Sequence, residues 1–195
     1  MKQIDYTDCK NLEEFKQKTL DGLAKVYSEE YIEYLKAMPK YLSFCNSYRE
    51  LGTNQGGSAS VALLQNLNYY EFIDKSFKKL NCNKQIFNSY IEKEKIKCVF
   101  RESNSLQVDT DIKTDFLLVD SVHKFKHVMK EIELYAPITN KYIMFHDTNG
   151  IPEVYDAVQT FLEKSNSWIE IERYNIAAGY TVIKKIHEEQ QSYNY

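Results

Sequence analysis

The chain of 195 residues carries 28 acidic and 25 basic side chains, which gives a net charge of −3. Because these charges are interspersed along the sequence, they form no basic block of the kind that binds nucleic acid or an anionic membrane. A chain of this length most simply forms one domain, 1–195, which can bury roughly 70% of its unfolded surface.

The cysteines and the N-terminus indicate the compartment. The four cysteines form no C-x-x-C pair, which is typical of a reducing environment and argues against a disulfide framework or a zinc site. The N-terminus is polar and acidic, unlike a signal peptide, and no run of 18 apolar residues occurs. We therefore expect a cytoplasmic protein that binds neither membrane nor nucleic acid, while a homo-oligomer remains open.

Two helices are predicted within residues 11–38, where apolar residues recur at helical spacing. Pro39 is expected to end the second helix, because proline has no N–H to donate to the preceding turn. These helices would form an N-terminal cover, 1–40, over an α/β core at 47–186.

Beyond residue 47, short apolar runs alternate with helical stretches. The first run ends at Glu50, and the others lie at 69–73, 98–100, 116–119, 142–145, 169–171 and 180–183. Helices are expected near 56–67, 78–94, 123–136 and 152–164. Unbroken apolar runs are typical of parallel strands buried on both faces, so the sequence predicts a doubly wound, mostly parallel, seven-stranded α/β sheet. The last two strands have no helix between them and should form an antiparallel hairpin at one edge. The tail after Ile186 is expected to fray.

The first strand runs into a turn, ELGTNQGGS, that holds three of the six glycines. At Gly52, Gly56 and Gly57 the backbone can adopt positive φ and approach a ligand at the N-terminus of the following helix. The spacing differs from G-x-G-x-x-G, and Glu50 would repel a pyrophosphate, which disfavours NAD or FAD and favours a locally cationic cofactor. A purely structural turn is the alternative.

Ligands of doubly wound sheets bind beyond the carboxyl ends of the strands, where this sequence places polar residues. Asp74 ends the second strand about 20 residues after the first glycine, a position from which an acid binds ribose hydroxyls. A helix N-cap is the alternative role for Asp74. Glu102, Asn104 and Ser105 follow the third strand.

The fourth strand is followed by Asp120, and the fifth by His146 and Asp147. These side chains could hold a divalent cation; oxygen ligands favour magnesium, and His146 would shift the preference toward manganese or iron. Helix capping by the two acids is the alternative. His123 has a side chain that can accept a proton near neutral pH, whereas His127, one turn further along, is expected to be an ordinary surface residue.

Four separated segments resemble class I S-adenosylmethionine-dependent methyltransferases, in the branch of the cephalosporin hydroxylase-like and macrocin-type O-methyltransferases (methyltransferase family 24-like). RELGTNQGGSAS is similar to the E-x-G-x-x-x-G-G-S cofactor loop, and YYEFIDKS to the ribose-binding strand. FLLVDSVHKFKHVMKEI and YIMFHDTN resemble the ends of strands four and five, and GYTVIKK fits the last strand. The resemblance covers residues 48–184 and implies a Rossmann-like fold whose last strand is antiparallel.

The resemblance also implies roles for individual residues. The cofactor S-adenosylmethionine would contact Asp74 through its ribose, Asn104 and Ser105 through its adenine, and Asp120. Its methionine end would contact Glu50, Gly52, Thr53, Asn54, Gly56, Gly57 and Ser58. Asp120, His146 and Asp147 stand where metal-dependent relatives bind a cation, with His146 in place of one acid. His123 matches the general base of sugar-methylating relatives, beside Asp120.

The expected activity is transfer of a methyl group to a hydroxyl of a sugar, a glycan precursor or a similar small molecule, with Mg²⁺ or Mn²⁺ as a further cofactor. Tyr27, Tyr31 and Tyr34 on the N-terminal helices could close over the acceptor. One alternative is a catalytically inactive S-adenosylmethionine-binding domain in a glycan or natural-product assembly system. A nicotinamide oxidoreductase is a second alternative, disfavoured by the glycine spacing and by Glu50.

Overall fold

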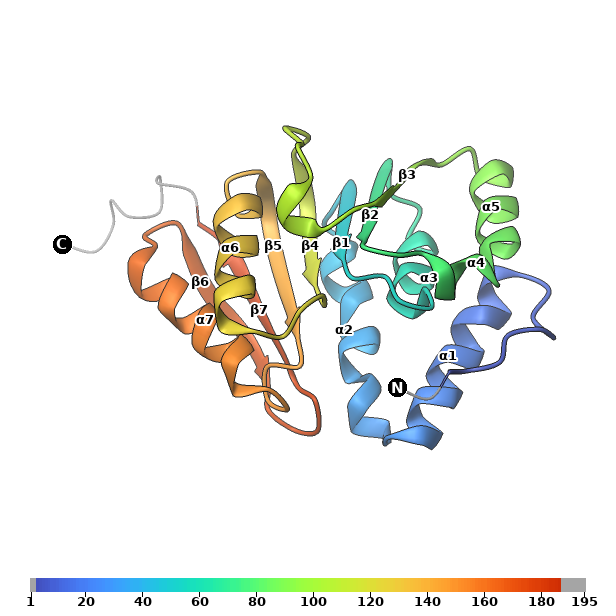
Figure 1. The fold of residues 1–195 in the computed structure, drawn as a ribbon, viewed down its shortest axis with the longest axis horizontal. Helices are drawn as coiled ribbons and strands as arrows, with labels where there is room; N and C mark the ends of the chain where they lie inside the picture. The colour runs from blue at the N-terminus through green and yellow to red at the C-terminus, as the bar shows by residue number, and fades with distance from the viewer. Residues whose placement is uncertain (1–2, 187–195) are drawn as a thin grey trace.

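A seven-stranded sheet forms the centre of the computed structural model, which describes residues 3–186 (Figure 1). The strands are β1 (Ser47–Leu51), β2 (Tyr69–Asp74), β3 (Lys97–Glu102), β4 (Thr114–Val119), β5 (Thr139–His146), β6 (Trp168–Tyr174) and β7 (Tyr180–Lys185). They lie in the order β3-β2-β1-β4-β5-β7-β6, and β7 pairs antiparallel with both β5 and β6. The predicted doubly wound fold and edge hairpin are confirmed. The tail after Ile186, for which fraying was predicted, lies outside the described residues.

Helices cover both faces of the sheet and create two separate apolar cores. One face is covered by α1 (Leu12–Val26), the 3₁₀ helix η1 (Glu29–Ile32), α2 (Glu33–Leu42), α3 (Gly57–Leu63), α4 (Lys78–Asn81) and α5 (Lys84–Lys93). The other face is covered by α6 (Phe125–Tyr135) and α7 (Pro152–Lys164). A short 3₁₀ helix, η2 (Ser105–Gln107), connects β3 to β4.

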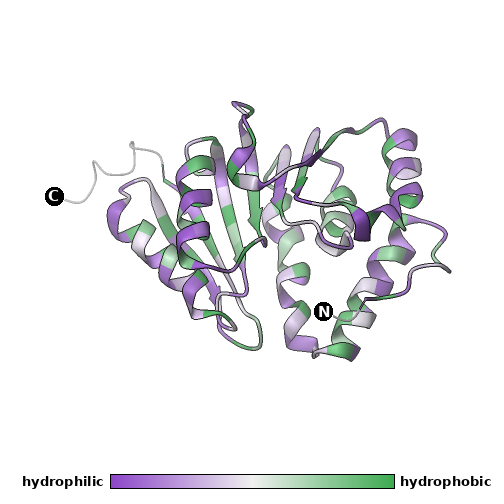
Figure 2. Ribbon diagram, viewed as in Figure 1, coloured by the Kyte–Doolittle hydropathy of each residue, from purple (hydrophilic) through white to green (hydrophobic). Residues whose placement is uncertain are grey.

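Strand β4 shows why the apolar runs predict a sheet covered on both sides. Phe116 and Leu118 belong to the core beneath α2 and α3, whereas Leu117 and Val119 belong to the core beneath α6 and α7. Successive side chains of a strand point to opposite faces, so a strand buried on both faces must be apolar throughout. In Figure 2 green stretches lie in the strands beside α6 and α7, whereas both helices alternate between purple and green, as amphipathic helices do.

The prediction that Pro39 ends the second N-terminal helix is wrong, because α2 continues through Pro39 to Leu42. Proline removes the N–H that would bond to the carbonyl of Leu35. The neighbouring Met38, Tyr41 and Leu42 are buried, and the N–H of Ser43 bonds to the carbonyl of Pro39. Tertiary packing of this face therefore outweighs the local cost of proline.

The ends of β1 and β4 lie against each other, and Gly52 makes this contact possible. Gly52 has φ 93°, and a Cβ atom there would lie 2.1 Å from the carbonyl oxygen of Asp120. The N–H of Asp120 bonds to the carbonyl of Leu51, and that of Gly52 to Ile73. The turn after β1 is therefore held beside the end of β4.

Among residues 3–186, none of the helices combines the length and apolar character needed to cross a bilayer.

Candidate active site

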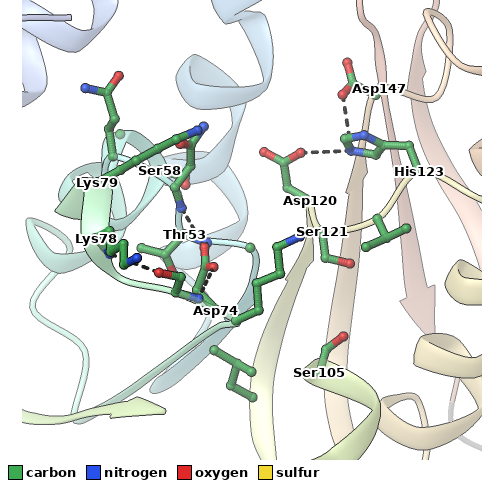
Figure 3. A pocket seen from close by; sticks show the side chains of 18 of the residues that line it. Thr53, Ser58, Asp74, Lys78, Lys79, Ser105, Asp120, Ser121, His123 and Asp147 are labelled. Atoms are coloured by element: carbon green, nitrogen blue, oxygen red, sulfur yellow. Dashed lines mark hydrogen bonds and ion pairs between the residues drawn. The ribbon is translucent and has the colours of Figure 1, made fainter. Parts of the chain in front are cut away.

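A pocket of about 760 Å³ lies at the carboxyl ends of β1 to β5 and is closed on one side by the N-terminal segment and helices (Figure 3). Most of the residues predicted from the strand ends line it: Gly52, Thr53, Asn54, Gly57, Ser58, Asp74, Asn104, Ser105, Asp120, His123 and Asp147. Glu50, Gly56 and His146 lie behind its wall. The structure thus brings the predicted site residues together around one cavity.

The glycines of the turn before α3 make room mainly for neighbouring protein. Gly56 has φ 93°, and a Cβ atom there would lie 2.7 Å from atoms of Leu80 and Phe87. Gly57 does not have the positive φ that was expected; it starts α3, where a Cβ atom would lie 2.8 Å from Thr19. Gly57 is therefore needed for close packing of α3 on α1.

Asp74 fixes the shape of the cofactor loop. One carboxylate oxygen, Oδ2, accepts the backbone N–H groups of Thr53 and Asn54, each at 2.9 Å. The other, Oδ1, accepts the N–H of Ser76 at 3.0 Å. Figure 3 shows Asp74 in the wall below Thr53 and Ser58. Because a carboxylate has about four lone-pair sites, Asp74 keeps acceptor capacity for a ligand in the pocket.

Glu50 lies behind Ser58 and is fully buried. Ser58 Oγ donates to Glu50 Oε1 at 2.5 Å, and the Tyr48 hydroxyl donates to Oε2 at 2.9 Å. Burial raises the pKa of Glu50 to about 8, because the charged form loses its hydration, although the bonds from Ser58 and Tyr48 oppose the shift. The contact of Glu50 with the pocket is therefore made through Ser58.

Two carboxylates and two histidines form a cluster at the ends of β4 and β5. The Nε2 atom of His123 lies 3.2 Å from Asp120 Oδ1 and 3.2 Å from Asp147 Oδ2 (Figure 3). The Nδ1 atom of His146 lies 3.2 Å from Asp120 Oδ1 and 3.6 Å from Asp147 Oδ2. Asp147 has φ 61°, a left-handed conformation that few non-glycine residues adopt and that aspartate tolerates better than most.

Asp120 and the two histidines stabilise one another's charges, whereas burial raises the pKa of Asp147. The hydrogen bond to Asp120 raises the pKa of His123 above its ordinary value, although burial opposes it. Burial favours neutral Asp120, but the neighbouring His146 and His123 outweigh it and lower the pKa of Asp120 to about 2. Because Nε2 of His123 faces both carboxylates, we assign its proton there. Within residues 3–186 no hydrogen bond occupies the other ring nitrogen, Nδ1.

The same cluster contains a set of side chains that fits a divalent cation. Asp120, His146 and Asp147 each offer one ligand atom, and these atoms lie within 4.8 Å of one another. Two carboxylate oxygens and one imidazole nitrogen suit manganese or iron as well as magnesium. A cation between the two carboxylates would compete with His123, which already contacts both.

Aromatic residues of the N-terminal helices close the pocket above His146. The Tyr34 ring packs on the His146 ring with centroids 3.9 Å apart, and Tyr31 contacts it edge-on at 5.5 Å. Tyr27 stacks on Tyr31 at 4.3 Å. Tyr31 and Tyr34 line the pocket, whereas Tyr27 is 43% exposed. The N-terminal cover thus supplies an aromatic wall next to the histidine and carboxylate cluster.

The interpretation of His127 as a surface residue is wrong. His127 is half-buried, lines the pocket, and places Nε2 3.2 Å from Oε1 of the fully buried Glu131. The two residues are four apart on α6 and therefore share a helix face, which is the signal that could have paired them. Burial of Glu131 reflects contacts with distant segments, which helical spacing alone does not reveal.

Further pocket residues were not expected from the sequence. The Gln55 side chain bonds to the backbone of Ile4 twice, at 3.2 Å and 3.0 Å, and so holds the N-terminal segment over the pocket. Ile4 and Tyr6 line the cavity as a result. The other lining residues missed are Thr19, Leu23, Ile73, Lys75, Ser76, Lys78, Lys79, Ser103, Ser121 and Val122.

No protein-family model matches the sequence, and the curated proteins contain no match. Solved structures are nevertheless similar in fold. One is a protein assigned as a caffeoyl-CoA O-methyltransferase from Staphylococcus aureus, with 15% identity, a TM-score of 0.63, and coverage of 88% of this chain and 99% of that chain. Another is an O-methyltransferase from Bacillus cereus in complex with SAH, with 14% identity, a TM-score of 0.56, and coverage of 86% and 90%.

A third similar structure is the N-methyltransferase NodS from Bradyrhizobium japonicum in complex with S-adenosyl-L-homocysteine (SAH). It has 13% identity and a TM-score of 0.58, with 91% of this chain and 100% of that chain covered. At such low identity the likeness establishes the fold, and it agrees with the strand order and with the position of the pocket at the strand ends. The chain has the fold of the class I S-adenosylmethionine-dependent methyltransferases.

Proposed function

We propose that this protein is an S-adenosylmethionine-dependent O-methyltransferase that acts on a hydroxyl of a sugar, a glycan precursor or a similar small molecule. One observation carries the proposal: a single pocket has a glycine loop held by Asp74 on one side and a histidine held by two carboxylates on the other (Figure 3). The first arrangement suits a nucleoside cofactor, and the second suits removal of a proton from an acceptor.

In this proposal the cofactor lies across the ends of β1 to β4. Gly52, Thr53, Asn54, Gly57 and Ser58 surround its methionine end, with Gly56 and Glu50 supporting them from behind. Asp74 accepts hydrogen bonds from the ribose. Asn104 and Ser105, at the end of β3, contact the adenine, and Asp120 completes the wall at the end of β4.

The chemistry assigned to the chain is alignment and proton removal. The acceptor oxygen forms a bond to the methyl carbon, the carbon–sulfur bond breaks with its electron pair going to sulfur, and the hydroxyl proton passes to His123. Because Nε2 faces the carboxylates, Nδ1 is the atom that receives this proton. Asp120 and Asp147 orient the ring and stabilise the positive charge that it gains.

In an alternative form of the proposal, Asp120, His146 and Asp147 hold a divalent cation, since their ligand atoms fit one, in place of the contacts that His123 makes with both carboxylates. When bound, such a cation acts as a Lewis acid that lowers the pKa of the acceptor hydroxyl.

We expect manganese or magnesium to bind the purified protein, and the double substitution Asp120→Asn and Asp147→Asn to abolish binding, because both carboxylates supply ligands. Elemental analysis and calorimetry with each metal measure this. Full activity in excess chelator, with no metal detected, would exclude the cation and leave His123 to act alone.

The acceptor class is supported by the aromatic wall. Tyr31 and Tyr34 line the pocket next to the cluster, and aromatic ring faces pack well against the apolar C–H faces of sugars. Of the three similar structures described above, two are named O-methyltransferases and the third an N-methyltransferase, so the two support a hydroxyl acceptor and the third does not.

Calorimetry with S-adenosylmethionine, SAH and NAD, followed by transfer of an isotope-labelled methyl group to a panel of hydroxylated acceptors, tests the function. We expect binding of the first two ligands and labelling of a sugar or glycan precursor. Binding of NAD alone would favour the oxidoreductase. Binding of S-adenosylmethionine without transfer to any acceptor would favour the inactive binding domain, which the presence of His146 in place of an acid also suggests.

A further inference from the structure

Three side chains in the pocket wall converge on one oxygen of a buried carboxylate. Ser105 Oγ donates to Glu131 Oε1 at 2.5 Å, and Ser121 Oγ donates to the same atom at 2.6 Å. The Nε2 atom of His127 lies 3.2 Å from it and 3.3 Å from Ser105 Oγ. Ser105, Ser121 and His127 line the pocket, whereas Glu131 is fully buried on α6 behind them. The Glu131 carboxylate therefore does not face the cavity itself but contacts three side chains that do.

These bonds fix what the two serines can offer to a ligand. A hydroxyl has one proton to donate and two lone pairs that accept. Because Ser105 and Ser121 each direct the proton to Glu131, the cavity meets lone pairs only, and Ser105 keeps one for a ligand beside its contact with His127 Nε2. Figure 3 shows both serines on the side of the pocket opposite Asp74, Ser105 from η2 and Ser121 from the turn after β4. This part of the wall is therefore an acceptor surface.

The surrounding contacts hold this polarity in place. The Tyr135 hydroxyl donates to the backbone carbonyl of Ser105 at 2.6 Å, and Asn104 Oδ1 accepts the N–H of Leu106 at 3.0 Å, so the backbone of η2 is fixed. Within residues 3–186, Glu131 Oε2 is buried and makes no hydrogen bond. Burying a carboxylate whose second oxygen is unpaired is costly, which is consistent with a specific role for this acid.

We propose that Glu131 is a positioning residue that makes Ser105 and Ser121 read the 6-amino group of the cofactor's adenine ring. The inference rests on the proposed function, in which the adenine lies at the end of β3. An amino group brings two N–H donors to the two serine oxygens. The carbonyl oxygen of a hypoxanthine ring at the same position would meet only lone pairs, which leaves three acceptors unpaired.

The test compares SAH with its hypoxanthine counterpart, S-inosylhomocysteine, by calorimetry on the full chain. We expect the native protein to prefer the adenine compound by about tenfold or more, since hydrogen bonds are lost and buried acceptors are left unpaired. Glu131→Gln gives the side chain an N–H donor, so one serine can turn its proton into the pocket and the preference falls severalfold. Ser121→Ala lowers the preference by removing one acceptor. Glu133→Gln, on the exposed face of α6, leaves it unchanged.

Equal affinity of the native protein for the two compounds would overturn the role of Glu131 while leaving the proposed function intact. A preference that persists in both Glu131→Gln and Ser121→Ala would do the same. Should Glu131→Gln fail to fold, the ratio of the affinities of Ser121→Ala for SAH and S-inosylhomocysteine decides whether the proposal holds. Absence of SAH binding to the native protein would instead refute the proposed function, and this inference with it.

Discussion

Asp74 uses both carboxylate oxygens to hold backbone N–H groups and still faces the pocket. We expect Asp74→Ala to weaken S-adenosylmethionine binding by about 1.5 to 3 kcal/mol, the scale of hydrogen bonds to a charged group. Calorimetry measures the loss. Asp74→Asn is the matched variant, because its amide oxygen can still accept from the loop. Unchanged affinity in Asp74→Ala would remove this residue from the cofactor site.

His123 has one ring nitrogen facing two carboxylates and the other unoccupied within the described residues. We expect His123→Ala to lower kcat by about 100- to 10,000-fold, the usual contribution of general-base catalysis, with little change in cofactor affinity. Steady-state rates and calorimetry separate the two effects. The exposed Lys126, on the same helix, provides the control variant Lys126→Ala. Normal turnover of His123→Ala would place the base elsewhere, with His146 as the next candidate.

The sequence predicted the site residues that lie directly at strand ends. Asp120 and Asp147 follow unbroken apolar runs, and parallel strands bring their carboxyl ends to one edge of the sheet. It did not predict Glu131 or Gln55, whose partners lie far away in the chain. Ser105 is 26 residues from Glu131, and Ile4 is 51 residues from Gln55. Such hydrogen-bonded pairs depend on how helices and strands pack together, and a local sequence pattern does not predict that packing.

At the level of elements, α2 contains a proline that weakens it. Pro39 lies inside the helix and is only half-buried. We expect Pro39→Ala to raise the free energy of unfolding by about 2 kcal/mol. The substitution restores an N–H for the Leu35 carbonyl, and this gain is larger than the stability lost because the unfolded chain becomes more flexible without proline. Urea unfolding measures the change.

Pro137 is the control for this experiment, since it lies in the turn between α6 and β5. There Pro137→Ala should lower the free energy of unfolding by about 0.4 to 1 kcal/mol, because the unfolded chain gains conformational freedom and no helix bond is restored. A stability loss in Pro39→Ala would show that proline favours the observed path of α2.

Periodicity predicted the type and order of the elements better than their ends. Helical spacing identified α1 and α2, but the proline rule misplaced the end of α2 because burial of Tyr41 and Leu42 decides it. The edge hairpin followed from the absence of a helix between its strands. Which of the two strands joins β5 did not follow, because this choice depends on pairing across the whole sheet.

For the molecule as a whole, the buried Glu50 links stability to pH. Its pKa is raised to about 8, so the folded chain keeps a proton that the unfolded chain releases near its ordinary value of 4.5. The protonated carboxyl of Glu50 therefore contributes fully to stability below the unfolded pKa, and this contribution is lost as pH rises toward about 8. Over that range the free energy of unfolding falls by at most about 1.4 kcal/mol per pH unit.

Urea unfolding across this pH range measures the effect. Glu50→Gln, which does not titrate, should lose less stability than the native chain as pH rises through the window. Glu92→Gln, at an exposed position of α5, should follow the native curve. Parallel curves for the native chain and Glu50→Gln would show that Glu50 does not carry the proton.

The place of β7 has a consequence for how the chain is made. Although β7 is the last strand among residues 3–186, it lies between β5 and β6, with an antiparallel neighbour on each side (Figure 1). During synthesis the earlier strands can pair as they emerge, but β5 and β6 have no common partner until β7 leaves the ribosome. The open edge of β5 is a transient site for wrong strand pairing, so a nascent chain stalled before Tyr180 should need a chaperone that a chain with β7 in place does not.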